Sequence, residues 1–320
     1  QPTGELILGR IEAYRRRSSE LSVRACRASR IDQIESPELF DLRMECLARS
    51  RATVNAVAAA FVHPTPTLVD NALDAIDRAT DMSLCTSARE LLVPLRAPSD
   101  PVKRATAAAL RTRLIAASMM DAAGQYADAS KAAEQIAAEA TRDGLRELEA
   151  DAWRISAFTH SQSGKLIEAR DAFHRGLAAA EASGHQHARA DMYLALVFVE
   201  SHLQHPDEAT RWVGQARGLI DRIGDPDLQW RLLWADATAI MGKEPARAAT
   251  LVHEAMAKRA SYTSAEDTRT MGLQQSLGAA QLISHDLVNA IRTFEASLAL
   301  GERLLGRDHP LLIGVLTSLG

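Results

Sequence analysis

Aromatic residues are scarce in this chain of 320 residues: Phe, Trp and Tyr make up 4%, although apolar residues overall reach 47%. Sheets favour aromatic and β-branched residues, so a chain poor in aromatics and rich in Ala, Leu and Arg favours helix. Basic residues are not in excess either, because 37 Lys and Arg stand against 41 Asp and Glu, giving a net charge of −4. Nucleic-acid-binding domains usually carry a basic surplus, so the charge balance argues against a nucleic-acid partner.

Long apolar runs are also missing. The best candidates, around 56–62 and 311–316, fall well short of the roughly 18 residues that a membrane span needs. The chain does not start with Met and has no signal-peptide pattern, so we expect it to be a piece of a longer protein. The compartment stays open: cytoplasmic, or extracytoplasmic if a membrane span precedes Gln1.

Motifs of catalysis are absent as well. The sequence contains no Ser-x-x-Lys, Gly-x-Ser-x-Gly or His-Glu-x-x-His motif, no Gly-rich phosphate loop, and no HRD or DFG motif. Six of the ten histidines fall between His160 and His205, but their spacing suits the tips of helical hairpins better than a zinc site. We therefore expect no enzyme activity, no catalytic residues, no cofactor and no metal. An enzyme with a site built on the helices remains a weaker alternative.

Only three cysteines are present, Cys26, Cys46 and Cys85. Cys26 and Cys46 lie ten residues on either side of Ser36, where the sequence predicts the turn between two antiparallel helices. Residues equidistant from such a turn lie at similar heights, so one interpretation is a disulfide between Cys26 and Cys46, with Cys85 left over. The alternative is three small buried residues in a reducing compartment. The sequence leaves both open.

A repeat is the strongest positive feature of the sequence. In five places a helix ends in a short turn and the next helix carries an alanine at the same position. These alanines are Ala129, Ala169, Ala209, Ala248 and Ala290. Their spacings of 40, 40, 39 and 42 residues follow the turns, which chance would not produce in an Ala-rich protein. The sequence therefore predicts an array of helical hairpins.

The turns and the residues around them carry the chemistry of a hairpin. Gly124 and Gly164 stand where a first helix ends, as expected for residues with positive φ. The repeated alanines allow two helices to approach closely, and large apolar residues four positions later fill the space between hairpins. Those residues are Phe173, Val213, Val252 and Phe294. A single hairpin cannot bury such a stripe, so neighbouring hairpins must stack.

One unit resembles the tetratricopeptide repeat (TPR) signature, through residues Trp153, Gly164, Leu166, Ala169 and Phe173. The resemblance covers about residues 102–320, with a period near 40, and the ending SLALGERLLGRDHPLLIGVLTSLG is similar to the long TPR variant. It implies an all-α fold, an α-α superhelix (TPR-like solenoid) of about five hairpins. A sixth unit is expected to begin near His309 and to be cut off. Asp236 departs from the pattern, because it stands where a small residue is expected.

Residues 1–100 do not follow the period. The pattern predicts helices at about 4–29, 37–62, 66–79 and 84–93 and a linker PLRAPSDP, so we expect an N-terminal helical segment at 1–100 and a TPR array at 101–320. The stretches ACRASR, SPELFDLRMECL and LC resemble the segment between kinase domain and TPR array in bacterial serine/threonine protein kinases of the myxobacterial type. That resemblance implies a regulatory region, and any kinase activity would belong to a missing N-terminal domain of the parent chain.

Candidate binding residues follow from the TPR resemblance, since the first helix of each TPR hairpin lines the inner groove. The residues placed there are Asp151, Arg154, Phe158, Asp191, Leu194, Phe198, Trp230 and Leu233. Exposed aromatics beside an arginine suit an interface anchor, and we expect binding around Phe158, Phe198 and Arg154. The alternative, that these residues pack on neighbouring helices, stays open.

The sequence thus favours a non-catalytic scaffold that binds a protein or peptide, as the sensory or regulatory region of a bacterial serine/threonine protein kinase. The alternative is the TPR arm of a transcriptional or signalling ATPase regulator. The sequence specifies neither the partner nor the oligomeric state.

Overall fold

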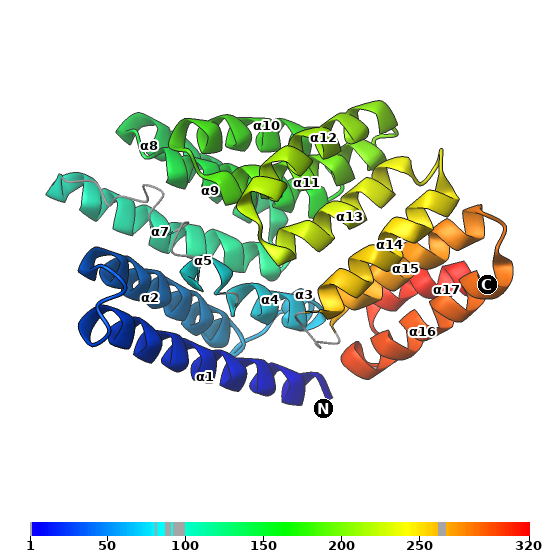
Figure 1. The fold of residues 1–320 in the computed structure, drawn as a ribbon, viewed down its shortest axis with the longest axis horizontal. Coiled ribbons are helices and arrows are strands. Elements are labelled where there is room, and N and C mark those ends of the chain that lie inside the picture. The colour runs from blue at the N-terminus through cyan, green and yellow to red at the C-terminus, as the bar shows by residue number, and fades with distance from the viewer. Residues whose placement is uncertain (1, 81, 87–90, 92–99, 262–266) are drawn as a thin grey trace. The chain divides into compact units, whose positions relative to one another are not determined.

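Helices make up all the regular structure in the computed structural model, which describes residues 2–80, 82–86, 91, 100–261 and 267–320 (Figure 1). No strand occurs within those ranges. The all-α fold class predicted from the sequence is confirmed, and its physical basis is a chain rich in Ala, Leu and Arg with few β-formers. No helix in the described ranges is long and apolar enough to cross a membrane.

The N-terminal part is a set of helices of unequal length. They are α1 (Pro2–Arg30), α2 (Pro37–Ala60), α3 (Pro66–Asp70), α4 (Ala72–Ala79) and α5 (Ser83–Thr86). The start of α2 follows from local chemistry, because the Ser36 hydroxyl accepts a hydrogen bond from the Leu39 backbone N–H at 3.1 Å. Pro37 takes the first helical position, where its missing N–H costs nothing.

The helix expected at 66–79 is two helices instead of one. Asn71 interrupts it with φ −98° and ψ 12°, and its side-chain amide donates to the Thr67 carbonyl at 3.0 Å. Asn side chains compete in this way with the backbone bonds of a helix, which is why the break falls there. The helix expected at 84–93 is described as α5 and Leu91; its remaining residues and linker residues 94–99 lie outside the described ranges.

Five helical hairpins follow, as the repeat predicted. Their helices are α7 (Pro101–Ala122), α8 (Tyr126–Asp143), α9 (Arg146–Gln162), α10 (Leu166–Ser183), α11 (Gln186–His202), α12 (Pro206–Ile223), α13 (Pro226–Ile240), α14 (Pro245–Ala260), α15 (Thr268–Ile283) and α16 (Leu287–Leu305). A 3₁₀ turn η1 (Pro310–Leu312) and α17 (Ile313–Leu319) come last, where the sequence places the start of a sixth unit.

Turns with a left-handed residue recur every 20 residues through the middle of the array. Residues with positive φ are Gly124, Gly144, Gly164, Gly184, Gln204 and Gly224. The values at Gly124 and Gly164, 77° and 75°, confirm the prediction made for these two glycines. The residue after the turn donates its N–H to a carbonyl five positions earlier, as Lys165 does to His160 at 2.9 Å. This pattern ends a helix cleanly and lets the chain reverse.

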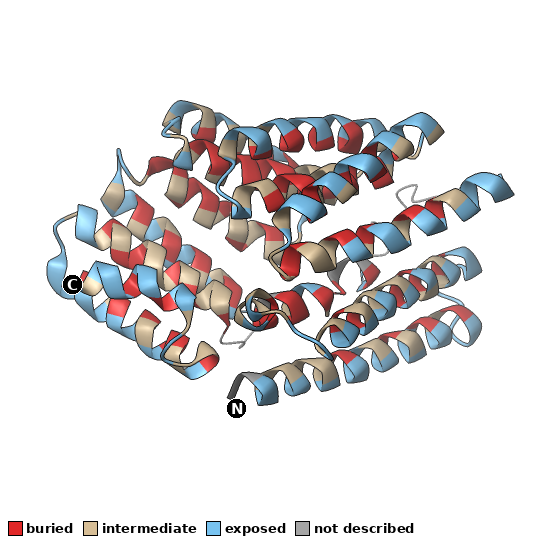
Figure 2. Cartoon of the chain, turned by 180° about the vertical axis from the view of Figure 1, so that it is seen from behind, coloured by how far each residue is buried: buried red, intermediate tan, exposed pale blue. Residues whose placement is uncertain are grey.

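Packing between the helices relies on the repeated alanines. Ala129, Ala169, Ala209 and Ala248 are 0% exposed and Ala290 is 1% exposed, so two helix backbones meet closely at each of them. The larger residues four positions later are also buried, as predicted: Phe173, Val213, Val252 and Phe294. Figure 2 shows the buried residues gathered along one side of many helices, as stacking of hairpins requires.

Asp236, which departs from the TPR pattern, has a structural partner. Its side chain is buried, and its Oδ2 accepts a hydrogen bond from Arg217 Nη2 at 2.6 Å. Arg217 lies on α12 and Asp236 on α13, so a charged pair joins two successive helices where a small residue was expected. A carboxylate buried without such a partner would be costly.

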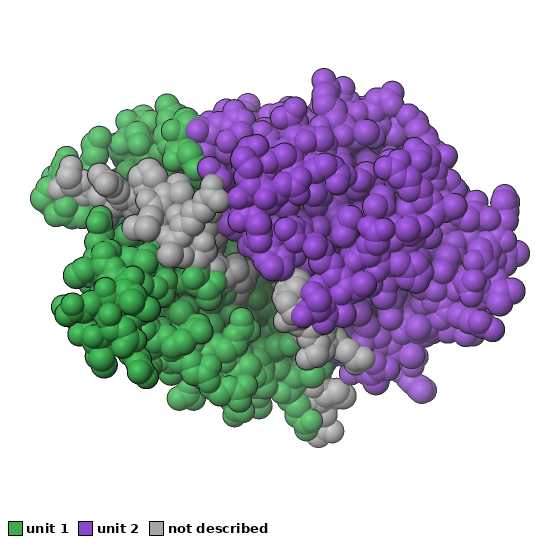
Figure 3. Space-filling model, viewed as in Figure 1, with its two compact units in different colours: residues 1, 3–156, 182–185 green, residues 2, 157–181, 186–320 purple. Residues whose placement is uncertain are grey.

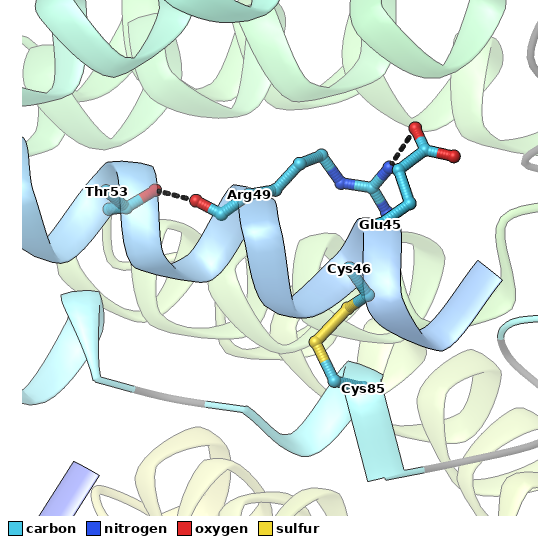
Figure 4. The surroundings of a disulfide bond; sticks show 5 residues. All are labelled: Glu45, Cys46, Arg49, Thr53 and Cys85. Atoms are coloured by element: carbon cyan, nitrogen blue, oxygen red, sulfur yellow. Dashed lines mark hydrogen bonds and ion pairs between the residues drawn. A yellow bond between two sulfur atoms is a disulfide. The ribbon is translucent and has the colours of Figure 1, made fainter. Parts of the chain in front are cut away.

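The disulfide differs from the one expected. Cys46 of α2 bonds to Cys85 of α5 (Figure 4), and their Cα atoms are 5.6 Å apart. Cys26 is free and exposed. The expected Cys26–Cys46 pairing is therefore wrong. Equal distance from the turn places two residues at similar heights, but it does not say which face of α1 is buried. Ala25 is buried, and Cys26 lies about 100° further around α1.

The chain divides into two compact units (Figure 3). The first holds the described residues of 3–156 and 182–185, and the second those of 157–181 and 186–320. Clusters around Ile76 and Leu110 form core in the first unit, and a cluster around Trp230 forms core in the second. The predicted boundary between an N-terminal segment (1–100) and a TPR array (101–320) is based on where the repeat begins, whereas the compact units are defined by contacts. That boundary therefore stays a prediction.

Candidate functional site

The predicted contact residues are distributed over both units. Asp151 and Arg154 lie on α9 in the first unit, with side chains 40% and 37% exposed and an Nε–Oδ1 distance of 3.8 Å. Each therefore has solvent-accessible charge, and the weak exposed ion pair between them leaves both available to a partner.

Phe158, in the second unit, has a fixed position on its own hairpin. Its ring meets the buried ring of Phe173 edge-on, with centroids 5.1 Å apart. Phe158 is half-buried, so part of the ring stays in contact with solvent. The contact with α10 orients that exposed part.

Two of the predicted contact residues are core instead. Leu194 and Trp230 are 2% and 1% exposed. The indole Nε1 of Trp230 donates to the Asp227 carboxylate at 2.9 Å, and the Arg259 guanidinium lies 5.6 Å from its ring centre. The indole N–H and the ring of Trp230 thus both contact other residues of the fold, and neither is available to a ligand. Leu233, half-buried, also packs on this core.

A face on α11, α13 and α15 gathers the accessible residues of the second unit. We define the first-helix face by six half-buried side chains on these helices, which are three, four or seven residues apart where one helix contributes more than one: Asp191, Phe198, Asp227, Arg231, Trp234 and Ser276. The rings of Phe198 and Trp234 meet edge-on with centroids 5.4 Å apart. Trp234 Nε1 donates to Ser276 Oγ at 2.8 Å, which holds the indole between α13 and α15.

Charges on the first-helix face are paired. Arg231 Nη1 donates to Asp191 Oδ1 at 2.7 Å and lies 3.6 Å from Asp227 Oδ2. Burial alone would lower the pKa of Arg231, but Asp191 and Asp227 outweigh it and hold that pKa above its usual value. Arg269 lies 4.0 Å from Asp227, so two arginines balance two aspartates. The face presents aromatic surface with little net charge.

The sequence prediction did not include Arg231 and Trp234, because the residues it named on this helix lie one position earlier. A spacing of 40 residues carries Asp191 to Arg231 and Leu194 to position 234, whereas the predicted residues on this helix were Trp230 and Leu233. Trp230 and Leu233 instead follow Asp191 and Leu194 by 39 residues, which is the spacing between Ala209 and Ala248. The missing residue falls in the turn between α13 and α14, so α13 itself keeps the register of α11. Counting forward from the preceding turn, Gly184 to Gly224, finds the half-buried residues Arg231 and Trp234.

The clustered histidines have structural partners rather than a metal arrangement. His187 Nε2 lies 3.0 Å from Asp225 Oδ2, and His205 Nδ1 lies 2.8 Å from Glu200 Oε2. Within the described residues, no three His, Cys, Asp or Glu side chains are placed to hold a metal ion. These pairs join helix ends and turns, so we assign them a structural role.

No family model matches the sequence, and no curated protein does so either. Similar solved structures include a putative kinesin light chain of Podosopora anserina with nearly identical TPR-like repeats, and a point variant of it. The variant shares 17% identity at a TM-score of 0.49, over 61% of this chain and 95% of that chain. The other gives 16%, 0.48, 61% and 96%.

Proposed function

We propose that the chain is a non-catalytic scaffold and that the first-helix face binds a protein segment. The observation that carries this proposal is the aromatic pair Phe198 and Trp234 beside Arg231, half-buried in a unit whose other large apolar residues are mostly core. Trp and Arg are the residue types that most often dominate binding energy at interfaces. Phe158, Asp191 and Leu233 are further proposed contacts in this unit, and Asp151 and Arg154 are proposed contacts in the first.

Pre-organisation supports this assignment. The Trp234 indole is held by Ser276, and the Arg231 guanidinium is held by Asp191, so neither side chain needs to be ordered when a partner arrives. Side chains that are already immobile save a binding cost of about 0.5–1.5 kcal/mol each. The balanced charges favour apolar and aromatic contacts over electrostatic attraction. We therefore expect affinity to depend only weakly on salt.

The experiment uses linear peptides selected on the purified chain from a phage-displayed library. Phe198→Ala should weaken binding of the selected peptides by about thirtyfold, the effect of truncating an anchor worth roughly 2 kcal/mol. The matched control is Phe294→Ala, because Phe294 is 3% exposed and lies on α16, outside the first-helix face. The control should lower the melting temperature and leave the affinity of the folded protein unchanged. Loss of stability in Phe198→Ala with unchanged peptide affinity would refute the proposal.

We also propose that this scaffold is the sensory or regulatory region of a bacterial serine/threonine protein kinase. The support is the resemblance of the stretches in residues 1–100 to the segment that precedes the TPR array in such kinases. The coding sequence of the parent protein tests it directly. A kinase domain with HRD and DFG motifs before Gln1 supports the proposal, whereas a P-loop there supports the alternative, a regulator with an ATPase domain.

A further inference from the structure

A second candidate site lies between α14, α15 and α16, within the second unit. It is a cavity of about 420 Å³ whose apolar lining comes from Met256, Leu277 and Ala296. Polar side chains complete the lining, among them His253, Gln274 and Arg292. A volume of this size lies within the range of ligand pockets in proteins, at about 300–1,000 Å³.

The cavity is separate from the first-helix face. Gln274 and Leu277, which line the cavity, lie three residues apart on one side of α15. Ser276, which bonds Trp234, follows Gln274 by two residues and lies about 200° away around the helix. The two sites therefore use opposite sides of α15, and a substitution in one need not disturb the other.

The charges around the cavity are of one sign. No Asp or Glu lines it, and its ionisable lining residues are Arg292 and His253, both exposed. Within the described part of the chain, neither has an ion-pair or hydrogen-bond partner. Arg217, Arg231 and Arg259 of the same unit all pair with aspartates. The charge at this cavity is left for a ligand.

One of the lining residues, Gln274, carries an unused acceptor. The Oε1 atom of Gln274 is buried and has no hydrogen-bond partner among the described residues. The neighbouring Gln281 differs, because its Oε1 accepts from the Thr293 hydroxyl at 2.8 Å. A buried carbonyl without a donor costs stability, and a peptide N–H is the donor that would satisfy it.

We propose that this cavity binds a peptide segment in which an apolar side chain stands next to an acidic one. The apolar side chain lies on Leu277 and Met256, the carboxylate accepts hydrogen bonds from Arg292, and a peptide N–H donates to Gln274. The three features are independent, and a Leu-Glu pair supplies all three within one short stretch of chain.

The probe is the peptide Gly-Leu-Glu-Gly, acetylated and amidated so that the Glu side chain carries its only charge. The chain is labelled with ¹³C at its Met methyl groups, and Met256→Leu identifies the Met256 signal. We expect a saturable shift of that signal and no shift of Met119, which lies in the first unit. Gly-Leu-Gln-Gly, capped in the same way, should bind about two- to fivefold more weakly, as expected for loss of one exposed ion pair. Gly-Gly-Glu-Gly should bind at least about fivefold more weakly, because it loses the apolar contact.

Arg292→Gln should remove the preference for Glu over Gln and leave the weaker binding of the Gln peptide unchanged. Arg307→Gln is the matched control, because Arg307 is an 84% exposed side chain that does not line the cavity. It removes the same charge and should keep the preference. Ala296→Phe, which fills the cavity, should abolish the shift.

Several results would overturn the proposal. These are no Met256 shift at millimolar peptide, equal affinity for the Glu and Gln peptides, or an equal loss in Arg307→Gln. The carboxylate could come from a Glu side chain or from a chain end. A Gly-Gly-Leu peptide that is acetylated at its N-terminus and has a free C-terminal carboxylate distinguishes the two. If that peptide binds and Gly-Leu-Glu-Gly does not, the cavity is a site for chain ends and the proposal is wrong.

Discussion

Single residues decide where this chain can turn, and Gly124 carries two requirements at once. Its φ of 77° favours glycine, and a Cβ atom there would lie 2.5 Å from the Thr67 Cγ2 atom. The close approach is fixed by Thr65, whose hydroxyl donates to the Ala123 carbonyl at 3.1 Å. The sequence predicts the first requirement from the position of the glycine. It cannot predict the second, because Thr67 is distant along the chain.

The matched pair Gly124→Ala and Gly144→Ala separates the two effects. Gly144 has a φ of 69° and nothing within 4 Å of the position of a Cβ. Each substitution should cost about 1 kcal/mol for the left-handed backbone, and Gly124→Ala should cost more because Thr67 must move. Urea unfolding of both variants measures the difference. Equal losses would show that the turn relaxes away from Thr67 at no cost.

Glu147 on α9 gives a pH-dependent prediction. Burial first, and then the nearby Asp151 carboxylate, raise the pKa of Glu147 to about 7, against the opposing effects of Arg111 and Arg49. A carboxyl group whose pKa is raised on folding stabilises the protein below its unfolded pKa. That contribution is lost as the pH rises from about 4.5 to about 7. Glu147→Gln should therefore raise stability at pH 8 by about 1–3 kcal/mol and leave it unchanged at pH 4.

Glu139 is the control of opposite sign. Its carboxylate accepts two hydrogen bonds from Arg113, at 2.6 and 2.9 Å, and that pairing lowers the pKa of Glu139. Glu139→Gln should therefore lower stability slightly at neutral pH, and the effect should fade as the pH falls below 4.5. Thermal unfolding at both pH values measures the two variants together. A Glu147→Gln variant that is less stable at pH 8 would contradict the assignment.

At the scale of elements, the period of the alanines predicted the hairpins, because close helix packing requires a small residue at a fixed place in each repeat. The same argument could not place every contact residue. The alanine spacing is one residue shorter across the turn after α13, and the predicted Trp230 and Leu233 carry that shorter spacing. They therefore lie one residue away from the half-buried Arg231 and Trp234. Residue counts are reliable within a helix and unreliable across a turn of variable length.

The cysteines show a second limit of the same kind. The number of residues from the turn gives the position of a residue along the axis of a hairpin. The face of α1 that contacts α2, however, depends on packing. Cys46 and Cys85 are both buried, whereas Cys26 is exposed. The two bonded cysteines thus differ from the free one in burial, and no pattern in the sequence predicts which of the three is exposed.

The bond between α2 and α5 should contribute measurably to stability. It closes a loop with a sequence separation of 39 residues, for which loop entropy predicts about 4 kcal/mol. The double variant Cys46→Ala/Cys85→Ala should lower the urea midpoint by the corresponding amount, and dithiothreitol should do the same to the unaltered chain. Cys26→Ala is the control and should change neither. A midpoint insensitive to dithiothreitol would mean that the two thiols stay unbonded in solution.

At the scale of the whole molecule, a repeat array is stabilised by contacts between neighbours. Within the second unit, α11 packs on α12 and α13, α13 packs on α14, and α14 packs on α15. Each hairpin thus covers the apolar stripe of the one before it, as Leu273 and Leu277 of α15 do for Val252 of α14. Stability in such an array is a sum of local terms, so a perturbation should fade with distance along the chain.

Removal of the last hairpin tests this locality. A chain that ends at residue 261 loses α15 and α16, which uncovers Val252 and Ala255 on α14. Hydrogen exchange of α14 should then accelerate strongly, exchange of α13 should rise less, and exchange of α7 and α8 should stay as in the full chain. Mass spectrometry of peptic fragments resolves these helices separately. If α7 and α8 lost protection as fully as α14, the chain would unfold as one cooperative body, and the nearest-neighbour account of its stability would be wrong.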